Sequence, residues 1–211
     1  MDADEEIRRV VPLIRELGGS LGVPISVDTC KAKVAAAAIA AGAVIVNDVT
    51  GLHGDSRMVE VLRETGAGCI LMHMRGQPRT MQKMTDYHDL VQEITDYFQQ
   101  TLAAAVAAGV AAERFMIDPG IGFAKTVTQN LELVARLDCF RAIGRPVLMG
   151  PSRKSFIGAL LPGTAPKDRV WGTAGAVACC IMCGADVVRV HDVQEMRQVA
   201  TVAAAIRNVV A

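Results

Sequence analysis

The stretch PVLMGPSRKSFIG, residues 146–158, decides the fold because it joins a strand, a turn and a helix without a linker. Its first four residues are apolar, as in a buried strand, and a Gly-Pro turn follows at Gly150. Two adjacent cations, Arg153 and Lys154, come next, and helical sequence begins at about residue 153. A short apolar strand that runs through a polar turn into a helix is typical of a βα unit.

The same strand-and-helix pattern repeats along the chain. Helices are predicted at about 2–17, 31–41, 56–66, 87–108, 129–137, 153–160 and 169–183, with a closing helix at the end; Pro12 should bend the first helix or delay its start. Short apolar strands separated by helices indicate right-handed βαβ units and a parallel sheet covered on both faces. We therefore predict an α/β fold with six parallel strands, at residues 24–28, 43–48, 69–74, 114–120, 146–150 and 186–192.

Length and charge narrow the class of protein. A chain of 211 residues is long enough for one domain with a sizeable core, which we assign to residues 1–211. Lys plus Arg equals Asp plus Glu, so the formal net charge is zero, which argues against a nucleic-acid partner. No apolar run is long enough to span a bilayer, and residues 2–9 are too charged for the core of a signal peptide. A cytoplasmic location without a membrane partner is expected.

Three of the six cysteines, Cys179, Cys180 and Cys183, form a CCxxC run inside an apolar helix. Such a run could belong to a redox or metal site. No second CxxC or HxxxH completes a ligand set, so small buried helix residues in a reducing compartment are the favoured interpretation.

Polar residues collect where the predicted strands end. In a (β/α) barrel these ends meet at one face, which carries the active site. A helix N-cap is the alternative for any single one, such as Asp28 or Ser152, but caps do not account for six decorated ends together. The residues are Asp28, Asn47, Asp48, His73, Asp118, Ser152, Arg153, Lys154, Arg189, His191 and Asp192.

Their chemistry points to a particular ligand. Strand alternation would place Arg189 and His191 on one side, which favours an anion site. Asp28, Asn47 and Asp118 offer hydrogen-bond partners to a ring that presents several N–H and NH₂ groups. An amide, two carboxylates and a separate cationic corner suit a flat heterocycle that carries a phosphate ester.

Six motifs together resemble the dihydropteroate synthase family, a folate-pathway family with a TIM (β/α)₈ barrel. In chain order they are SVDTCKAKV, NDVTG, LMHMRGQPRTMQ, DPGIGFAKT, MGPSRKSFIG and RVHDV, and the likeness runs from about residue 4 to the end. DPGIGFAKT together with SRKS is the most distinctive part. The resemblance implies an α/β fold of the TIM-barrel type.

The family's site residues carry over to matching positions. Those of the pterin and p-aminobenzoate sites imply roles for Asp28, Asn47, Val49, Met72, Asp118, Phe123, Lys154 and Ser155, and we add Gly150 and Ser152 from the same turn as Lys154. The Arg and His of RVHD bind the pyrophosphate in the family, which assigns Arg189 and His191 to an anion site. Lys154, Arg189 and His191 are the expected catalytic residues. Arg153, beside Lys154, is expected to point away and serve structure.

The family reaction couples 7,8-dihydropterin methyl pyrophosphate to p-aminobenzoate, and pyrophosphate leaves with Mg²⁺ assistance. Electrostatic stabilisation of the departing anion and orientation of a weak nucleophile would carry it, without a covalent enzyme intermediate. The resemblance also implies a homodimer and a sulfonamide target. No residue of this chain is assigned as a metal ligand, because the family's Asn near Mg²⁺ belongs to an NxTPDSF-type loop that is absent here.

The length departs from the family pattern. A closed barrel needs eight strands and about 250 residues, whereas six strands are predicted here, so the first two βα units are expected to be missing. Two unpaired edges would favour association, and the chain is expected to bind a pterin weakly and turn over slowly. A pterin-binding methyltransferase and a non-catalytic pterin-binding remnant remain as alternatives, although SRKSFIG and RVHDV argue against methyl transfer.

Several smaller features have simpler interpretations. His73 is expected to be structural rather than a ligand. His53 and His88 are assigned to the surface. Arg75 and Arg79, in or beside the loop GQPRTMQ at residues 76–82, could assist an anion, but solvation at the surface is the safer prediction.

Overall fold

The computed structural model describes residues 1–77 and 80–210. The chain divides into two compact units. Unit 1 comprises Met1–His73 and Tyr97–Ile117, and unit 2 comprises Met74–Asp96 and Asp118–Ala211. That residues 1–211 act as a single pterin-binding domain stays a prediction.

Unit 1 is built on a sheet of four strands in the order β1-β2-β3-β4. Strand β1 (Ser26–Asp28) pairs in parallel with β2 (Ile45–Asp48), which pairs in parallel with β3 (Gly68–Met72). Strand β4 (Phe115–Asp118) lies next to β3 and ends at the boundary of the unit. The predicted parallel pairing is confirmed for β1, β2 and β3, and each observed strand is shorter than the predicted run.

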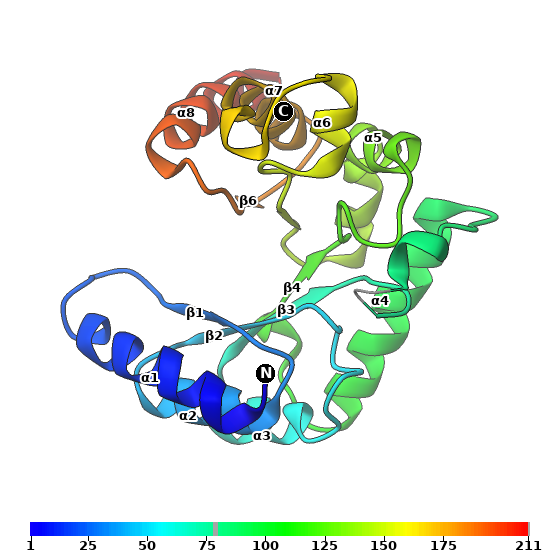
Figure 1. The fold of residues 1–211 in the computed structure, drawn as a ribbon. Helices are drawn as coiled ribbons and strands as arrows, with labels where there is room; N and C mark the ends of the chain where they lie inside the picture. The colour runs from blue at the N-terminus through cyan, green and yellow to red at the C-terminus, as the bar shows by residue number, and fades with distance from the viewer. Residues whose placement is uncertain (78–79, 211) are drawn as a thin grey trace. The chain divides into compact units, whose positions relative to one another are not determined.

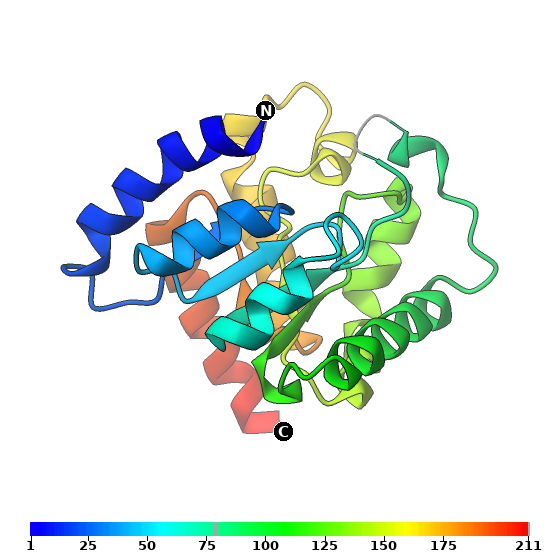
Figure 2. The same ribbon diagram turned by 90° about the horizontal axis from the view of Figure 1, so that it is seen from below.

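The helices of unit 1 follow the predicted pattern. Helix α1 (Ala3–Gly18) packs on α2 (Ala32–Ala40), and α2 packs on α3 (Met58–Thr65). Figures 1 and 2 show α2 and α3 covering one side of strands β1 and β2. Asp2 caps α1 by accepting a hydrogen bond from the N–H of Glu5, and Pro12 lies inside the helix. The predicted late start at Pro12 is therefore wrong, because the cap fixes the start upstream of the proline.

Helix α4 (Leu90–Ala107) begins in unit 2 and ends in unit 1. It places Tyr97 and Phe98 in unit 1, where Phe98 is fully buried. His73, at the end of β3, is 3% exposed and meets the ring of Tyr97 edge-on at 4.9 Å between centroids. The prediction of a structural His73 is consistent with this packing.

Unit 2 holds a two-stranded parallel sheet of β5 (Leu148–Met149) and β6 (Val187–Val188), with Leu148 opposite Val187. Its helices are α5 (Val127–Ala135), α6 (Ser155–Leu160), α7 (Val170–Met182) and α8 (Val193–Val210). Figure 1 shows α6, α7 and α8 beside one another, and a core cluster joins the last two. That cluster consists of Val177, Ile181, Met196 and Ala203.

The described residues also contain four short 3₁₀ helices. They are η1 (Met81–Lys83), η2 (Ala112–Arg114), η3 (Leu137–Ile143) and η4 (Pro166–Asp168). Among the described residues, no helix combines the length and apolarity that crossing a membrane requires.

The cysteine prediction is confirmed for one residue of the CCxxC run and wrong for another. Cys180 is buried in α7, Cys179 is exposed, and Cys183 is half-buried at the helix end. Helical periodicity accounts for this result, because neighbouring residues of an amphipathic helix face different sides. All six cysteines are free thiols.

Asp48, at the end of β2, fixes the turn that follows this strand. Its side chain is fully buried; Oδ1 accepts hydrogen bonds from the N–H and hydroxyl of Thr50, at 2.8 and 2.6 Å, and Oδ2 accepts from the N–H of Leu52 at 3.1 Å. The turn contains Leu52 and Gly51 with positive φ, 69° and 58°, so the backbone needs such support. Asp48 is thus a structural residue of the strand end.

We predict that Asp48→Asn lowers the free energy of unfolding by about 1–3 kcal/mol, because an amide NH₂ would replace one acceptor and face a donor inside the protein. Urea unfolding followed by circular dichroism measures the change. Asp168→Asn, at an exposed position in η4, is the matched control and should leave the midpoint unchanged. Equal midpoints for the Asp48 variant and the unmodified chain would contradict the role given to Asp48.

Candidate functional site

In unit 1 the parallel register brings two predicted site residues together. Asp28 of β1 lies directly opposite Asn47 of β2, so both side chains leave the sheet on the same face at the carboxyl ends of their strands. Asp28 is exposed and Asn47 is 7% exposed. Met72, the last residue of β3, is buried, and Val49 is half-buried just beyond β2.

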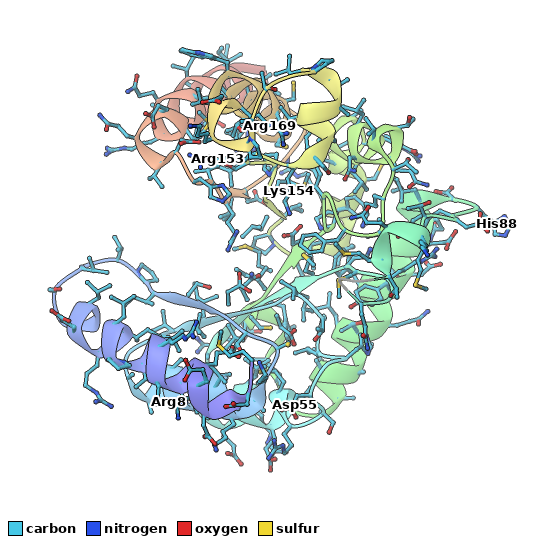
Figure 3. The ribbon with its side chains drawn as sticks, viewed as in Figure 1. Arg8, Asp55, His88, Arg153, Lys154 and Arg169 are labelled. Carbon is cyan, nitrogen blue, oxygen red and sulfur yellow. The ribbon has the colours of Figure 1, made fainter. Side chains whose placement is uncertain are left out.

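The capping alternative for Asp28 is wrong. Helix α2 has Lys31 at its N-cap position, and the N–H of Ala32 donates to Asp55 at 3.0 Å. Asp55 comes from the loop before α3 and is labelled in Figure 3. A carboxylate from a distant part of the sequence therefore supports the start of α2.

In unit 2 the central residue is Asp118, the last residue of β4, which is 8% exposed. Its Oδ1 accepts a hydrogen bond from the N–H of Gly120 at 2.8 Å. Burial raises the pKa of this carboxyl to about 6, while that bond and the positive charges of Lys154, Lys125 and Arg189 act in the opposite direction. A buried carboxylate surrounded by cations is suited to accept hydrogen bonds from a ligand that carries N–H groups.

Lys154 supplies one of these charges. It is half-buried at the N-cap position of α6, and its ammonium lies 4.1 Å from the ring centroid of Phe123, which is a cation–π contact. Gly122 permits this approach, because a Cβ at that position would lie 3.0 Å from the Lys154 side chain. The structure thus brings Asp118, Phe123 and Lys154 into one group, as predicted.

Arg153 serves structure, as predicted. Its backbone is in the left-handed region with φ 58°, and its guanidinium pairs with both carboxylate oxygens of Asp192. The backbone N–H of Arg153 donates to the hydroxyl of Thr173 at 3.1 Å, and its backbone carbonyl accepts a hydrogen bond from the guanidinium of Arg169 at 3.1 Å. These contacts hold a strained turn in place, and the turn sets the start of α6 at Ser155. Figure 3 labels Arg153, Lys154 and Arg169 in this region.

Ser152 and His191 form a second pair. The Ser152 hydroxyl lies 2.9 Å from Nδ1 of His191, and the backbone N–H of His191 donates to the same hydroxyl at 3.2 Å. Ser152 is 4% exposed, so this buried hydroxyl holds an exposed imidazole in place. Because α6 has Lys154 at its N-cap position, the capping alternative for Ser152 is wrong.

Strand β6 ends at Val188, short of the predicted strand at 186–192. Strand alternation therefore gives no basis for placing Arg189 and His191 on one side, and that placement stays a prediction. The N–H of Arg189 donates to the carbonyl of Met149 at 2.9 Å, and both predicted anion-site side chains are exposed. Gly150 is half-buried, and a Cβ at this position would lie 3.9 Å from the Cβ of Arg189. Ser155 is exposed at the first position of α6.

Sequence reasoning missed two residues of the loop after Asp118. Lys125 is 3% exposed and Asn130 is 2% exposed, and both bond to the loop backbone. A lysine among Gly and Ala residues of a tight loop, seven residues after a strand-end carboxylate, was the available signal for the first. Nothing in the pattern of helix α5 distinguishes Asn130 from an exposed helix residue.

The surface assignments met mixed outcomes. His53 and His88 are exposed, and Figure 3 shows His88 on the edge of the view. Arg75 is not a solvated surface residue, because it pairs with Glu93 and lies 3.8 Å from the ring centroid of Tyr87. Arg79 falls outside the described residues.

No three His, Cys, Asp or Glu side chains in the described part of the chain form a group that could hold a metal ion. Mg²⁺ as a cofactor stays a prediction from the family resemblance. The predicted meeting of all the strand ends at one face also stays a prediction.

Comparison with known proteins adds to this geometry. The family model described as pterin binding enzyme matches residues 1–191. The dihydropteroate synthase of Synechocystis is 46% identical over 202 residues, which cover 96% of this chain and 70% of that protein. A dihydropteroate synthase structure from Yersinia pestis, solved as a sulfonamide drug complex, has a TM-score of 0.94 at 38% identity and covers 99% of this chain and 76% of its own.

A third comparison concerns a ligand complex. The dihydropteroate synthase of Xanthomonas albilineans, solved with 7,8-dihydropteroate, has a TM-score of 0.91 at 36% identity. The match covers 98% of this chain and 76% of that one. The TM-scores of 0.94 and 0.91 show that both solved structures have the same fold as this chain.

Proposed function

Because the chain belongs to the dihydropteroate synthase family of pterin-binding enzymes, we propose that it condenses 7,8-dihydropterin methyl pyrophosphate with p-aminobenzoate. In this reaction the bond between the methylene carbon and the pyrophosphate oxygen breaks, and a bond from the aniline nitrogen to that carbon forms. The nitrogen loses a proton, and the products are 7,8-dihydropteroate and pyrophosphate. The match to the Yersinia structure confirms the predicted α/β fold of the TIM-barrel type.

The observation that carries this proposal is the group formed by Asp118, Phe123 and Lys154. The buried carboxylate of Asp118 offers a charged acceptor for the N–H groups on one edge of a pterin. The ammonium of Lys154, held against Phe123 at 4.1 Å, supplies a cation close to this acceptor. In the proposed reaction Lys154 would reach the pterin ring and the reaction centre, as the resemblance implies.

The residues of the proposed anion site have a different task. Arg189 would hold the pyrophosphate as it departs and gains negative charge, because a guanidinium forms strong bonds to phosphate oxygens. His191 would donate a second hydrogen bond through Nε2, since its Nδ1 faces the hydroxyl of Ser152. In this proposal Ser152 acts through His191 rather than by touching the substrate.

Asp28, Asn47, Val49 and Met72 are proposed to bind the pterin, on the strength of the sequence resemblance and the register of β1 and β2. Ser155 and Phe123 are likewise proposed to border p-aminobenzoate. Mg²⁺ is retained as a proposed cofactor, and no step is assigned to it.

The methyltransferase alternative is disfavoured. The Synechocystis relative and the two solved structures are dihydropteroate synthases, and one of these structures contains 7,8-dihydropteroate. The alternative of a pterin-binding protein without turnover differs in one outcome only, the formation of product.

A homodimer in the cytoplasm is also proposed. The support for self-association is an apolar groove of about 440 Å³ between α7 and α8 and the exposure of Val202 and Ile206, 61% and 55%, on its rim. An exposed apolar surface of this kind favours association, because contact with a second copy removes it from water. Light scattering of the purified chain would give twice the monomer mass if the proposal holds and the monomer mass if it does not.

The test of the reaction is a product assay on the purified chain. We expect 7,8-dihydropteroate only when both substrates and Mg²⁺ are present. The sequence predicts slow turnover, so the measured rate should lie below that of a typical enzyme. Omission of p-aminobenzoate is the control for spontaneous breakdown of the pterin pyrophosphate. Pterin binding without any product would favour the non-catalytic alternative, and the absence of both would contradict the proposed function.

A further inference from the structure

The loop that follows Asp118 has an unusual backbone. Gly120, Gly122 and Ala124 all have positive φ, at 74°, 83° and 51°. Ala124 is fully buried and has a Cβ, so this conformation is unfavourable for it. A backbone of this kind persists only when surrounding contacts determine it.

Lys125 provides several of those contacts from inside the protein. Its side chain is 3% exposed, and its ammonium donates hydrogen bonds to the carbonyls of Gly120 at 3.2 Å and Phe123 at 3.0 Å. These two carbonyls lie on either side of the Gly122 turn that faces Lys154. The buried ammonium therefore holds these two carbonyls, and the loop between them, in place.

Asn130, in helix α5, fixes the same loop without a charge. Its Oδ1 accepts from the N–H of Gly122 at 2.6 Å, and its Nδ2 donates to the carbonyls of Lys125 and Thr126 at 3.3 and 2.7 Å. The loop thus has one charged and one neutral buried anchor. The difference between them separates the effect of charge from the effect of shape.

We propose that Lys125 is a positioning residue for the pterin site, which both shapes the loop that carries Phe123 and keeps Asp118 ionised so that it can accept hydrogen bonds from the pterin. This inference rests on the proposed function. Lys125 acts through the loop and through Asp118 and does not need to touch the substrate.

The charges around the pair support the coupling. Burial lowers the pKa of Lys125 to about 7, whereas the negative charge of Asp118 raises it and the positive charge of Arg75 lowers it further. The positive charges of Lys154, Lys125 and Arg189 in turn act on Asp118. Burial raises the pKa of the Cys180 thiol, and the negative charge of Asp118 raises it further. Near pH 7 the carboxylate is ionised and the ammonium is close to its midpoint, so each group affects the other's proton within the range where the enzyme would work.

The first test is the pH dependence of pterin binding between pH 5 and 8, measured by calorimetry with a pterin that lacks the pyrophosphate. In the unmodified chain affinity should fall as Asp118 is protonated below about pH 6. Lys125→Met removes the cation and should move this midpoint upward by about one pH unit, which lowers affinity at pH 6 about fivefold. Asn130→Ala is the matched control, because it loosens the loop and should weaken binding at every pH without moving the midpoint.

The second test needs neither the Lys125 variant nor a ligand. Asp118→Asn removes the anion that raises the pKa of Lys125, so the titration of ¹³C-labelled Lys125, followed by NMR, should shift to lower pH. An unmoved Lys125 titration in this variant, or equal binding midpoints in the unmodified chain and Lys125→Met, would overturn the inference. Failure of the unmodified chain to bind any pterin would count against the proposed function instead, while the NMR comparison would still decide whether the two groups are coupled.

Discussion

Replacing Asp118 with asparagine is expected to weaken pterin binding by about 2–4 kcal/mol, which corresponds to roughly 30- to 1,000-fold in Kd. The substitution keeps the shape of the side chain and exchanges one acceptor oxygen for an NH₂ donor. One charged hydrogen bond to the pterin is lost, and a donor then faces the donors of the ligand. Calorimetric titration of the variant with a pterin measures the change.

The free energy of unfolding of Asp118→Asn should rise or stay unchanged, although its affinity for the pterin falls. Burial raises the pKa of Asp118 from its ordinary value to about 6, so the folded state holds this proton more tightly than the unfolded state does. The ionised carboxylate therefore costs folding free energy above pH 6, and this cost disappears below about pH 4. Asp118→Asn removes the charge, and at pH 7 the variant should be at least as resistant to urea as the unmodified chain.

The two readouts together protect the prediction from misinterpretation. Loss of affinity in a stable variant assigns Asp118 to the site, whereas loss of both would indicate misfolding. Asp138→Asn, at an exposed position in η3, is the matched control and should leave affinity and stability unchanged. An unchanged pterin affinity in Asp118→Asn would remove Asp118 from the site.

Arg189→Ala is expected to lower kcat by about 100- to 1,000-fold, the typical cost of removing one preorganised contact to a developing charge. The side chain is exposed, while its backbone N–H is bonded to Met149 of β5, so its truncation should not unfold the strand pair. Affinity for a pterin that lacks pyrophosphate should change little. Affinity for the pyrophosphate-bearing substrate should fall markedly.

The comparison of the two ligands is the decisive part of this prediction. Arg197→Ala, at an exposed position in α8, is the control for a general loss of positive charge and should leave both affinities and kcat unchanged. Equal losses of affinity for both ligands in Arg189→Ala would show that Arg189 is structural and would remove it from the proposed anion site.

Much of the fold could be predicted because apolar runs and helical periodicity are local properties. The structure has a strand at each predicted strand and a helix at each predicted helix. Strand ends were harder to predict, since pairing with a neighbour, not composition, determines where a strand stops. Residues 186–192 read as one continuous run, yet β6 contains only Val187–Val188, because its partner β5 is equally short.

The candidate site could be predicted in part for a related reason. Polar residues at strand ends are visible in the sequence, and Asp118 and Lys154 were found in this way. The separate roles of the neighbours Arg153 and Lys154 depend on Asp192 and Phe123, which lie far away along the chain. Lys125 was missed because a buried lysine depends on carbonyls that a tight loop turns inward, and no sequence pattern records their direction.

The measurement that tests the central claim most directly is the pH dependence of kcat/KM for the pterin substrate, followed as p-aminobenzoate-dependent release of pyrophosphate between pH 5 and 8. This ratio reports ionisations of the free enzyme. Since Asp118 must be ionised to accept hydrogen bonds from the pterin, kcat/KM should fall with acid around a midpoint of about 6, and this acid limb should disappear in Asp118→Asn. Release that does not depend on p-aminobenzoate, or an acid limb that persists unchanged in Asp118→Asn, would contradict the account.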